Sequence, residues 1–202
     1  MSISPNHCTS PPKGAGLNET QLPFYSKGGD FLVELRSKKY FDMIKLKPFR
    51  QTPGFCGPVS LKMVLDYYGV SVPETEIAKV AGATREKGTS IEGLVKAAKH
   101  FGFRAFVKEK STLGDLRYYI KREIPVIVDW FFENDGHYSV VVDIDKKNIV
   151  LMDPTLRKVF IYVRRRKFST EEFLRIWFDF PGDFIKDPKD LILRLMLVVT
   201  PE

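Results

Sequence analysis

The stretch Gln51-Thr-Pro-Gly-Phe-Cys56-Gly-Pro-Val-Ser-Leu61 decides the fold, because it leads from a loop through a cysteine into a helical pattern of apolar residues. Pro58 is tolerated in the first turn of a helix, where its missing N–H has no intrahelical partner. Gly69 suits the left-handed position that follows a helix end. The apolar positions that repeat at helical spacing between these limits are Val59, Leu61, Met63, Val64, Tyr67 and Tyr68. The sequence therefore predicts a mostly buried central helix with Cys56 at its mouth.

The remaining pattern places helices in the first half of the chain and strands in the second. Glycines, prolines and capping patterns separate the segments. Further helices are predicted from Ser71, from a capping box at Thr89 to Glu92, over 113–121, and from the Ser169 to Glu172 cap through Trp177. Strands are predicted over 44–49, 104–108, 125–131, 137–144, 149–152, 158–163 and 191–200. Helices followed by an antiparallel sheet are typical of an α+β domain.

Residues 1–42 differ in composition from residues 43–202. Ser, Pro, Gly, Asn and Lys dominate the leader as far as Gly29, and Met43 directly precedes the first strand-like run. Two interpretations stay open: a disordered extension, or sequence upstream of the true start at Met43. We expect one domain over 43–202, and we assign no chemistry to His7 and Cys8 of the leader.

Charge and cysteine content limit the classes of function. The net charge is +7, and the basic residues are spread along the chain except at Arg164, Arg165, Arg166 and Lys167. No aromatic residue is interleaved with this cluster, so we interpret it as a solvated strand-to-helix connection. An acidic partner remains possible there, and nucleic acid is the disfavoured alternative.

Only two cysteines occur, which excludes a disulfide framework and a zinc site built of thiols. We expect no cofactor and no metal. A reducing compartment, the lack of an apolar signal segment and the lack of a membrane-spanning apolar stretch together predict a cytoplasmic protein.

Cys56, His137 and Asp153 follow one another in an order suited to a nucleophilic hydrolase. A thiol attacks as its thiolate, which the positive end of a helix and a neighbouring imidazolium would both favour. His137 begins a predicted strand, and Asp153 ends the next one across the turn at 145–148, so the two should lie near each other. Taken singly, each has an ordinary interpretation: an inert core thiol, an edge histidine and a strand-ending turn. His100 lies off the apolar face of its helix and is expected in solvent.

Gln51 could complete such a site. Its side-chain amide and the backbone N–H of Cys56 could donate hydrogen bonds to the oxyanion of a tetrahedral intermediate, and each donor of this kind contributes roughly 3 kcal/mol. The alternative is an ordinary loop glutamine.

Together these blocks resemble the papain-like peptidases of cysteine peptidase family thirty-nine, which are best known as leader-processing domains of bacteriocin-exporting ABC transporters. The resemblance rests on Gln51-x-x-x-x-Cys56-Gly-Pro-x-Ser-Leu, Gly136-His137-Tyr-Ser-Val-Val-Val-Asp, Asp153-Pro154 and Phe168-Ser-x-Glu-Glu-Phe-x-x-x-Trp177. It covers about residues 43–202 and implies a papain-like fold.

The family resemblance also implies roles for individual residues: Cys56 as nucleophile, His137 as general base and acid, Asp153 as its orienting group and Gln51 in the oxyanion hole. The spacing from glutamine to cysteine is one residue shorter than in transporter-linked members, and Phe55 stands where those members often have an acidic residue. Both departures, and the absence of transporter segments, match the stand-alone relatives.

The expected function is therefore a cysteine peptidase that hydrolyses peptide bonds through a thioester, with a peptide or protein as substrate. The same acyl-enzyme could serve an acyltransferase or a deamidase. A catalytically silent peptide-binding or regulatory module of the same fold is the alternative from another class.

Overall fold

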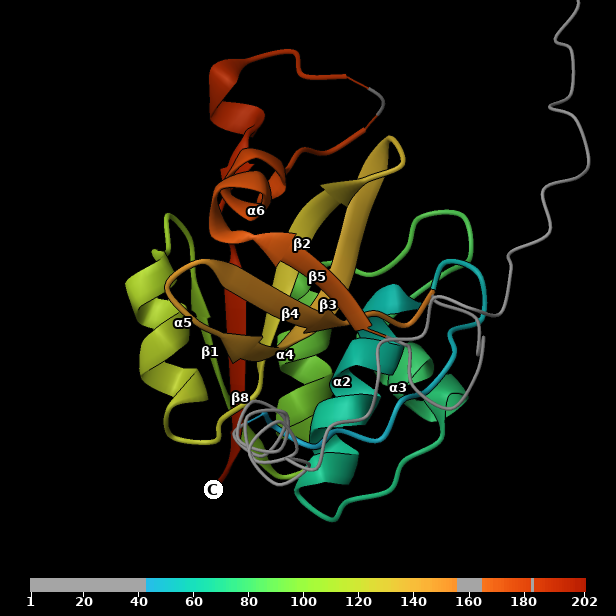
Figure 1. The fold of residues 1–202 in the computed structure, drawn as a ribbon. Helices are drawn as coiled ribbons and strands as arrows, with labels where there is room; N and C mark the ends of the chain where they lie inside the picture. Colours follow the sequence, from blue (N-terminus) through green and yellow to red (C-terminus); the bar gives the residue numbers. More distant parts are fainter. Residues whose placement is uncertain (1–42, 156–164, 183) are drawn as a thin grey trace, which may run out of the picture. The chain divides into compact units, whose positions relative to one another are not determined.

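The computed structural model describes residues 43–155, 165–182 and 184–202 (Figure 1). Three parts of the sequence-based predictions lie outside these residues: the leader 1–42 with His7 and Cys8, the strand at 158–163, and Arg164. No helix among the described residues is long and apolar enough to cross a membrane.

A six-stranded antiparallel sheet forms the centre of the fold, in the order β1-β8-β2-β3-β4-β5. The strands are β1 (Phe103–Lys108), β2 (Val126–Phe132), β3 (Asp135–Ile144), β4 (Asn148–Met152), β5 (Arg165–Ser169) and β8 (Met196–Pro201). A second, two-stranded sheet pairs β6 (Phe178–Asp179) with β7 (Ile192–Leu193). Because β2 and β3 are neighbours at the centre of the large sheet, side chains at their ends share one rim.

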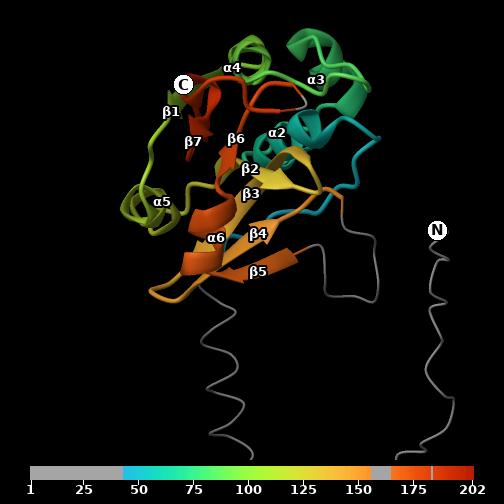
Figure 2. The ribbon, with the colours of Figure 1, turned by 90° about the horizontal axis from the view of Figure 1, so that it is seen from above.

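Three helices of the first half contact one another: α2 (Cys56–Tyr67), α3 (Glu74–Ala81) and α4 (Ile91–His100). Helix α2 packs against β3, and α4 packs against β1. The views in Figures 1 and 2 show these helices as neighbours, with α5 (Leu113–Ile120) and α6 (Thr170–Ile176) apart from them. A short 3-10 helix, η1 (Pro188–Asp190), precedes β7. The mixture of a helical first half and an antiparallel sheet confirms the predicted α+β class.

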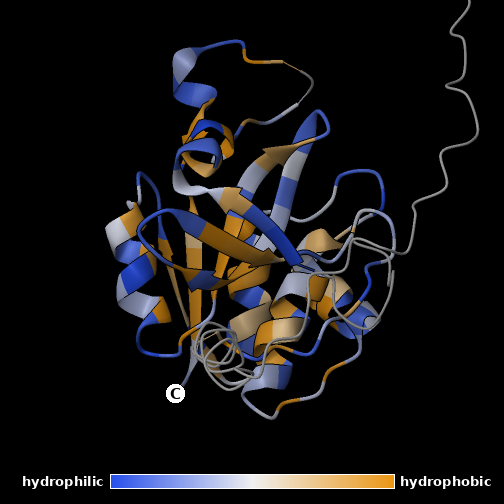
Figure 3. Ribbon diagram, in the orientation of Figure 1, coloured by the Kyte–Doolittle hydropathy of each residue, from blue (hydrophilic) through white to orange (hydrophobic). Residues whose placement is uncertain are grey.

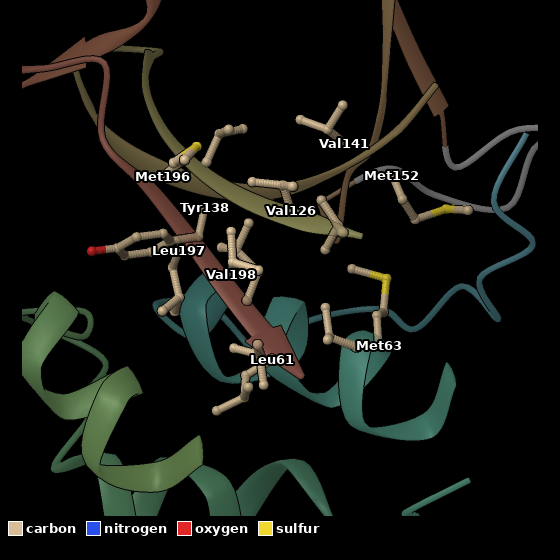
Figure 4. Packing of buried hydrophobic residues seen from close by; sticks show 14 of the residues in the cluster. Leu61, Met63, Val126, Tyr138, Val141, Met152, Met196, Leu197 and Val198 are labelled. Carbon is tan, nitrogen blue, oxygen red and sulfur yellow. The ribbon is translucent and has the colours of Figure 1, made fainter. Parts of the chain in front are cut away.

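The core lies between α2 and the central strands. Apolar residues concentrate on these elements in Figure 3, whereas β5 is largely hydrophilic. Figure 4 shows Leu61 and Met63 of α2 pointing toward side chains of the sheet, among them Val198 and Met152. Leu61 and Met63 are fully buried, and burial of a side chain of this size stabilises the fold by roughly 1.5–3 kcal/mol. The predicted apolar face therefore anchors the helix that carries Cys56.

Several local predictions are confirmed. Helix α2 begins at Cys56 and ends shortly before Gly69, whose φ is 85°. The turn joining β3 to β4 is closed by the Asp145 side chain, which accepts hydrogen bonds from the backbone amides of Lys147 and Asn148 at 2.6 and 2.7 Å. Ser169 and Glu172 form the predicted capping box, and His100 is exposed.

Three boundaries were predicted wrongly. The cap of α4 is Ser90, whose hydroxyl accepts a hydrogen bond from the Gly93 amide, so the helix starts one residue later than the box at Thr89 to Glu92 predicts. Residues 44–49 form no strand: the Ile44 amide donates to Val142 O at 3.0 Å, but Pro48 has no N–H to offer to a ladder. The last predicted strand is interrupted at Arg194, whose φ of 51° breaks the extended backbone.

The interpretation of the basic cluster is also corrected. Residues Arg165–Ser169 are not a connection but strand β5, which pairs with β4 over its whole length. Backbone hydrogen bonds to an ordered neighbour outweigh the low strand propensity of a basic run. Of the three described cluster residues, Lys167 alone is exposed.

Candidate active site

Cys56 is the first residue of α2 and is partly exposed. Phe55 stands at the N-cap without a side-chain cap, and the first turn contains no acidic residue. The free amides and the positive end of the helix dipole are therefore not neutralised by a neighbouring carboxylate of the helix. The sulfur therefore lies beside unpaired backbone amides at the start of the helix.

The loop before Cys56 is held by two contacts with other parts of the fold. The Thr52 amide donates to Glu74 Oε1 at 2.7 Å, which ties the loop to the start of α3. Gly54 has a φ of 81°, and a β-carbon there would lie 2.5 Å from the carbonyl oxygen of Arg85. Only glycine fits both the conformation and the contact, so the loop preceding the cysteine is narrowly constrained.

His137 lies in β3, is 5% exposed and interacts with both Cys56 and Asp153. Its Nε2 is 3.0 Å from Asp153 Oδ1 and the imidazole ring makes an edge contact with the ring of Trp130, with centroids 5.5 Å apart. Because Asp153 engages Nε2, Nδ1 is the ring nitrogen left for the hydrogen bond with the Cys56 thiol. The structure thus joins the three residues that the sequence singled out.

The charge state of His137 follows from these contacts. Burial by itself disfavours the imidazolium, but hydrogen bonds with Asp153 and Cys56 outweigh it and raise the pKa of His137 to about 9. The ring is therefore protonated at neutral pH. It can stabilise a thiolate, and it holds a proton that can be delivered to a leaving group.

Asp153 is fully buried and directly follows β4. Its Oδ1 also accepts hydrogen bonds from the Thr155 amide at 2.8 Å and the Thr155 hydroxyl at 2.7 Å, and its Oδ2 is ion-paired with Arg166 Nε. Burial would raise the pKa of Asp153, but His137, Thr155 and Arg166 together hold it well below its usual range. The carboxylate stays ionised and fixes the orientation of the histidine ring.

Arg166 is a site residue that the sequence interpretation missed. Met152 pairs with Arg165, so Asp153, one residue further, lies diagonally across from Arg166 on the same face of the sheet. The Arg166 guanidinium also lies over the ring of Phe132, 4.2 Å from its centroid. The sequence alone could not distinguish this arginine from its basic neighbours, because it does not reveal the register in which β4 pairs with β5.

Gln51 contacts the residue that follows Asp153. Its backbone amide donates to the carbonyl of Pro154 at 3.1 Å, which holds the loop before Cys56 beside the end of β4. Its Oε1 is buried and has no hydrogen-bond partner among the described residues. The side-chain oxygen of Gln51 is therefore available to accept a hydrogen bond.

A cavity of about 520 Å³ opens beside Cys56. It is bounded by the loop around Arg85 to Thr89, by the start of β3 at Gly136 and by Asp129, Tyr138 and Asp179. Among the described residues no group of three or more His, Cys, Asp or Glu side chains could hold a metal ion. The arrangement places a thiol beside a protonated histidine at the side of a cleft.

Comparison with known proteins agrees with this geometry. Residues 50–180 match the model of the Peptidase C39 family, and the chain belongs to that family. An uncharacterized protein of Methanothermobacter thermautotrophicus is 40% identical over 141 residues, which cover 70% of this chain and 82% of that protein. The Pediocin PA-1 transport/processing ATP-binding protein PedD of Pediococcus acidilactici is 32% identical over 125 residues, which cover 60% of this chain and 16% of that protein.

The fold also matches a solved structure. The crystal structure of a double glycine motif protease from an AMS/PCAT transporter, in complex with the leader peptide, superposes with a TM-score of 0.57. The two are 24% identical, and the match covers 79% of this chain and 94% of that one. The likeness confirms the papain-like fold expected from the sequence.

Proposed function

We propose that the protein is a cysteine peptidase that cleaves peptide bonds through a thioester intermediate. The observation that carries this proposal is that one histidine, buried in β3, contacts both Cys56 and Asp153 and is protonated at neutral pH. Burying a charged group is energetically costly, so a thiol that only fills the core would not be paired with a protonated histidine.

In the proposed reaction the Cys56 thiolate attacks the carbonyl carbon of the peptide bond. The oxyanion formed receives hydrogen bonds from the Cys56 amide and the Gln51 side chain. The C–N bond then breaks as His137 transfers its proton to the leaving amine, which leaves a thioester on Cys56. Water attacks the thioester while His137 accepts its proton, and release of the acid restores the thiolate and imidazolium pair.

The substrate class is a peptide or protein. The family supports this assignment, as does the similar fold of a protease whose structure contains a leader peptide. Transfer of the acyl group to another amine would use the same residues and differ only in which nucleophile reaches the thioester. A silent binding module would retain the cleft without needing the reactive thiol.

The test uses the full chain carrying Cys8→Ser. This substitution removes one of the two cysteines, so Cys56 provides the remaining thiol. Iodoacetamide is expected to alkylate Cys56 at pH 6 at least about tenfold faster than a free thiol, because a thiolate is the reactive species. His137→Ala should abolish this advantage, whereas His100→Ala, an exposed histidine on α4, should not.

Hydrolysis is then measured by mass spectrometry on a mixture of unlabelled peptides. Cleavage by the parent protein, lost in Cys56→Ala, supports the peptidase. Fast alkylation without any cleaved peptide would favour acyl transfer or deamidation, and alkylation no faster than for a free thiol would favour the binding module.

A further inference from the structure

The cavity beside Cys56 contains two carboxyl groups that the proposed reaction does not use. Asp129 comes from β2 and Asp179 from β6, strands of two different sheets. Both residues line the same cavity as Cys56. His137 is engaged with Asp153, so the acidic pair is distinct from the carboxylate that contacts the histidine.

Asp129 is a buried carboxyl with an unsatisfied oxygen. The residue is 3% exposed and lies opposite Tyr138 in the register of β2 and β3. The Tyr138 hydroxyl donates a hydrogen bond to this carboxyl, yet Oδ1 has no partner among the described residues. A buried oxygen without a partner destabilises the protein, and a ligand able to donate a hydrogen bond to it would recover much of that loss.

The Asp179 side chain lies against Gly136 of β3 and interacts with Asp129. A β-carbon at Gly136 would lie 2.3 Å from Asp179 Oδ2, so the Asp179 carboxylate rests directly against the backbone of β3. Burial raises the pKa of Asp179, and the charge of Asp135 acts in the same direction. Hydrogen bonds from the Phe180 amide and from Asp129 lower this pKa but do not outweigh the burial. Burial, followed by the charges of Asp179 and Cys56, raises the pKa of Asp129 well above its usual range.

Burial and the neighbouring negative charges therefore disfavour ionisation of both carboxyls together. A cation entering the cavity would offset their repulsion and allow both to ionise.

The cavity is also acidic within a basic chain. Its lining has four acidic residues, Glu86, Asp129, Asp135 and Asp179, against the basic Arg85 and Lys87, whereas the whole chain has a net charge of +7.

We infer that this cavity is a substrate subsite for a positively charged group, an ammonium or guanidinium of the peptide close to the bond that Cys56 attacks. The inference rests on the proposed function for the identity of the ligand as a peptide. Asp179 supplies the countercharge, and Asp129 Oδ1 supplies the unfilled acceptor. The ammonium can belong to a basic side chain or to the free amino terminus of the peptide.

The first test measures the charge preference of the cavity without requiring turnover. In the Cys8→Ser protein, Cys56 is modified by three methanethiosulfonates: the cationic 2-aminoethyl, the anionic 2-sulfonatoethyl and the neutral methyl reagent. The neutral reagent reports the intrinsic reactivity of the thiol, so each rate is divided by it. The cationic-to-anionic ratio is expected to fall at least about fivefold in Asp179→Asn, because one charge several ångströms away acts oppositely on the two reagents.

Asp66→Asn, near the far end of α2, is the matched control and should leave the ratio unchanged, since it lies about 15 Å along the helix from Cys56. Thermal unfolding of both variants verifies that each is folded. Should Asp179→Asn perturb the fold, Asp179→Ser is measured instead and is expected to lower the ratio in the same direction. An unchanged ratio in a folded Asp179→Asn protein would overturn the subsite.

The second test identifies the source of the cation. Peptides that carry lysine at each position near the scissile bond are compared with norleucine peptides, and free amino termini are compared with acetylated ones. The preferred cationic peptide should gain about tenfold in kcat/KM over its neutral match, and Asp179→Asn should remove that gain.

A gain with lysine identifies a basic side chain, and a gain only with the free amine identifies the amino terminus. Cleavage that ignores both charges would overturn the subsite while leaving the peptidase intact. If no peptide is cleaved at all, the proposed function fails, and the methanethiosulfonate ratios still decide the subsite.

Discussion

A contact of 3.0 Å joins His137 Nε2 in β3 to Oδ1 of Asp153, the residue that directly follows β4. The two residues are sixteen positions apart in the sequence. Asp153 holds the ring by one nitrogen and leaves the other for Cys56. This relationship determines both the charge of the histidine and its orientation, so most expectations for the site follow from it.

Asp153→Asn should lower the pKa of His137 below about 9, because the amide cannot supply the charge that favours the imidazolium. We expect peptide hydrolysis to slow by roughly a hundredfold or more, as is usual when a histidine loses its orienting carboxylate. The pH profile of Cys56 alkylation measures the shift, and Asp66→Asn serves as the control. An unchanged profile would contradict the role of Asp153.

The raised pKa of His137 also predicts a pH dependence of stability. The folded value is about 9 and the unfolded one near 6.5, so the stabilisation is fully present below about pH 6.5 and is lost as pH rises toward 9. The free energy of unfolding should fall over this window by on the order of 2–3 kcal/mol. Urea unfolding at pH 6, 7.5 and 9 measures it, with His137→Gln as the comparison that should show a flatter dependence.

Asp153 predicts the opposite dependence in acid. Its pKa is held well below the usual range in the folded protein, so its stabilisation is present above about pH 4 and is lost as pH falls further. Urea unfolding between pH 5 and 3 should show a loss of stability in the parent protein that is smaller in Asp153→Asn. Equal losses in both proteins would show that Asp153 is not the group responsible.

Arg166→Gln should destabilise the fold, since it removes the cation paired with the fully buried Asp153 carboxylate. We expect about 2–3 kcal/mol, below the value for a wholly buried pair because the arginine side chain is 24% exposed. Lys167→Gln in the same strand removes the same charge from an exposed position and should change stability by less than about 0.5 kcal/mol. Equal effects of the two substitutions, measured by urea unfolding, would refute the structural role of Arg166.

Gly54→Ala should destabilise the protein more than Gly69→Ala. Both residues have a positive φ, 81° and 85°, and so carry the same conformational penalty of about 1 kcal/mol. Only at Gly54 would the new β-carbon meet a backbone atom, the Arg85 carbonyl at 2.5 Å. Gly54→Ala should also slow Cys56 alkylation, because the loop before Cys56 would have to move. Similar unfolding midpoints and similar alkylation rates for the two variants would argue against this constraint.

Local features were predictable because neighbours in sequence encode them. The spacing of apolar residues after Cys56 identified α2, and the Asp145 turn and the Ser169 cap marked element ends correctly. The error at Ser90 arose because two adjacent residues could both cap the helix. The errors at residues 44–49 and at Arg194 arose where backbone partners decided the conformation.

The sequence by itself determined the α+β class, the cysteine at a helix start, and a histidine and an aspartate on successive strands of one hairpin. Only the tertiary structure decided that Arg166 neutralises Asp153 and that Asp129 and Asp179 meet beside Cys56. Periodicity and capping act over a few residues and can be recognised in any window of the chain. Contacts between strands depend on register and on which sheets meet, and these are settled only when the whole core packs.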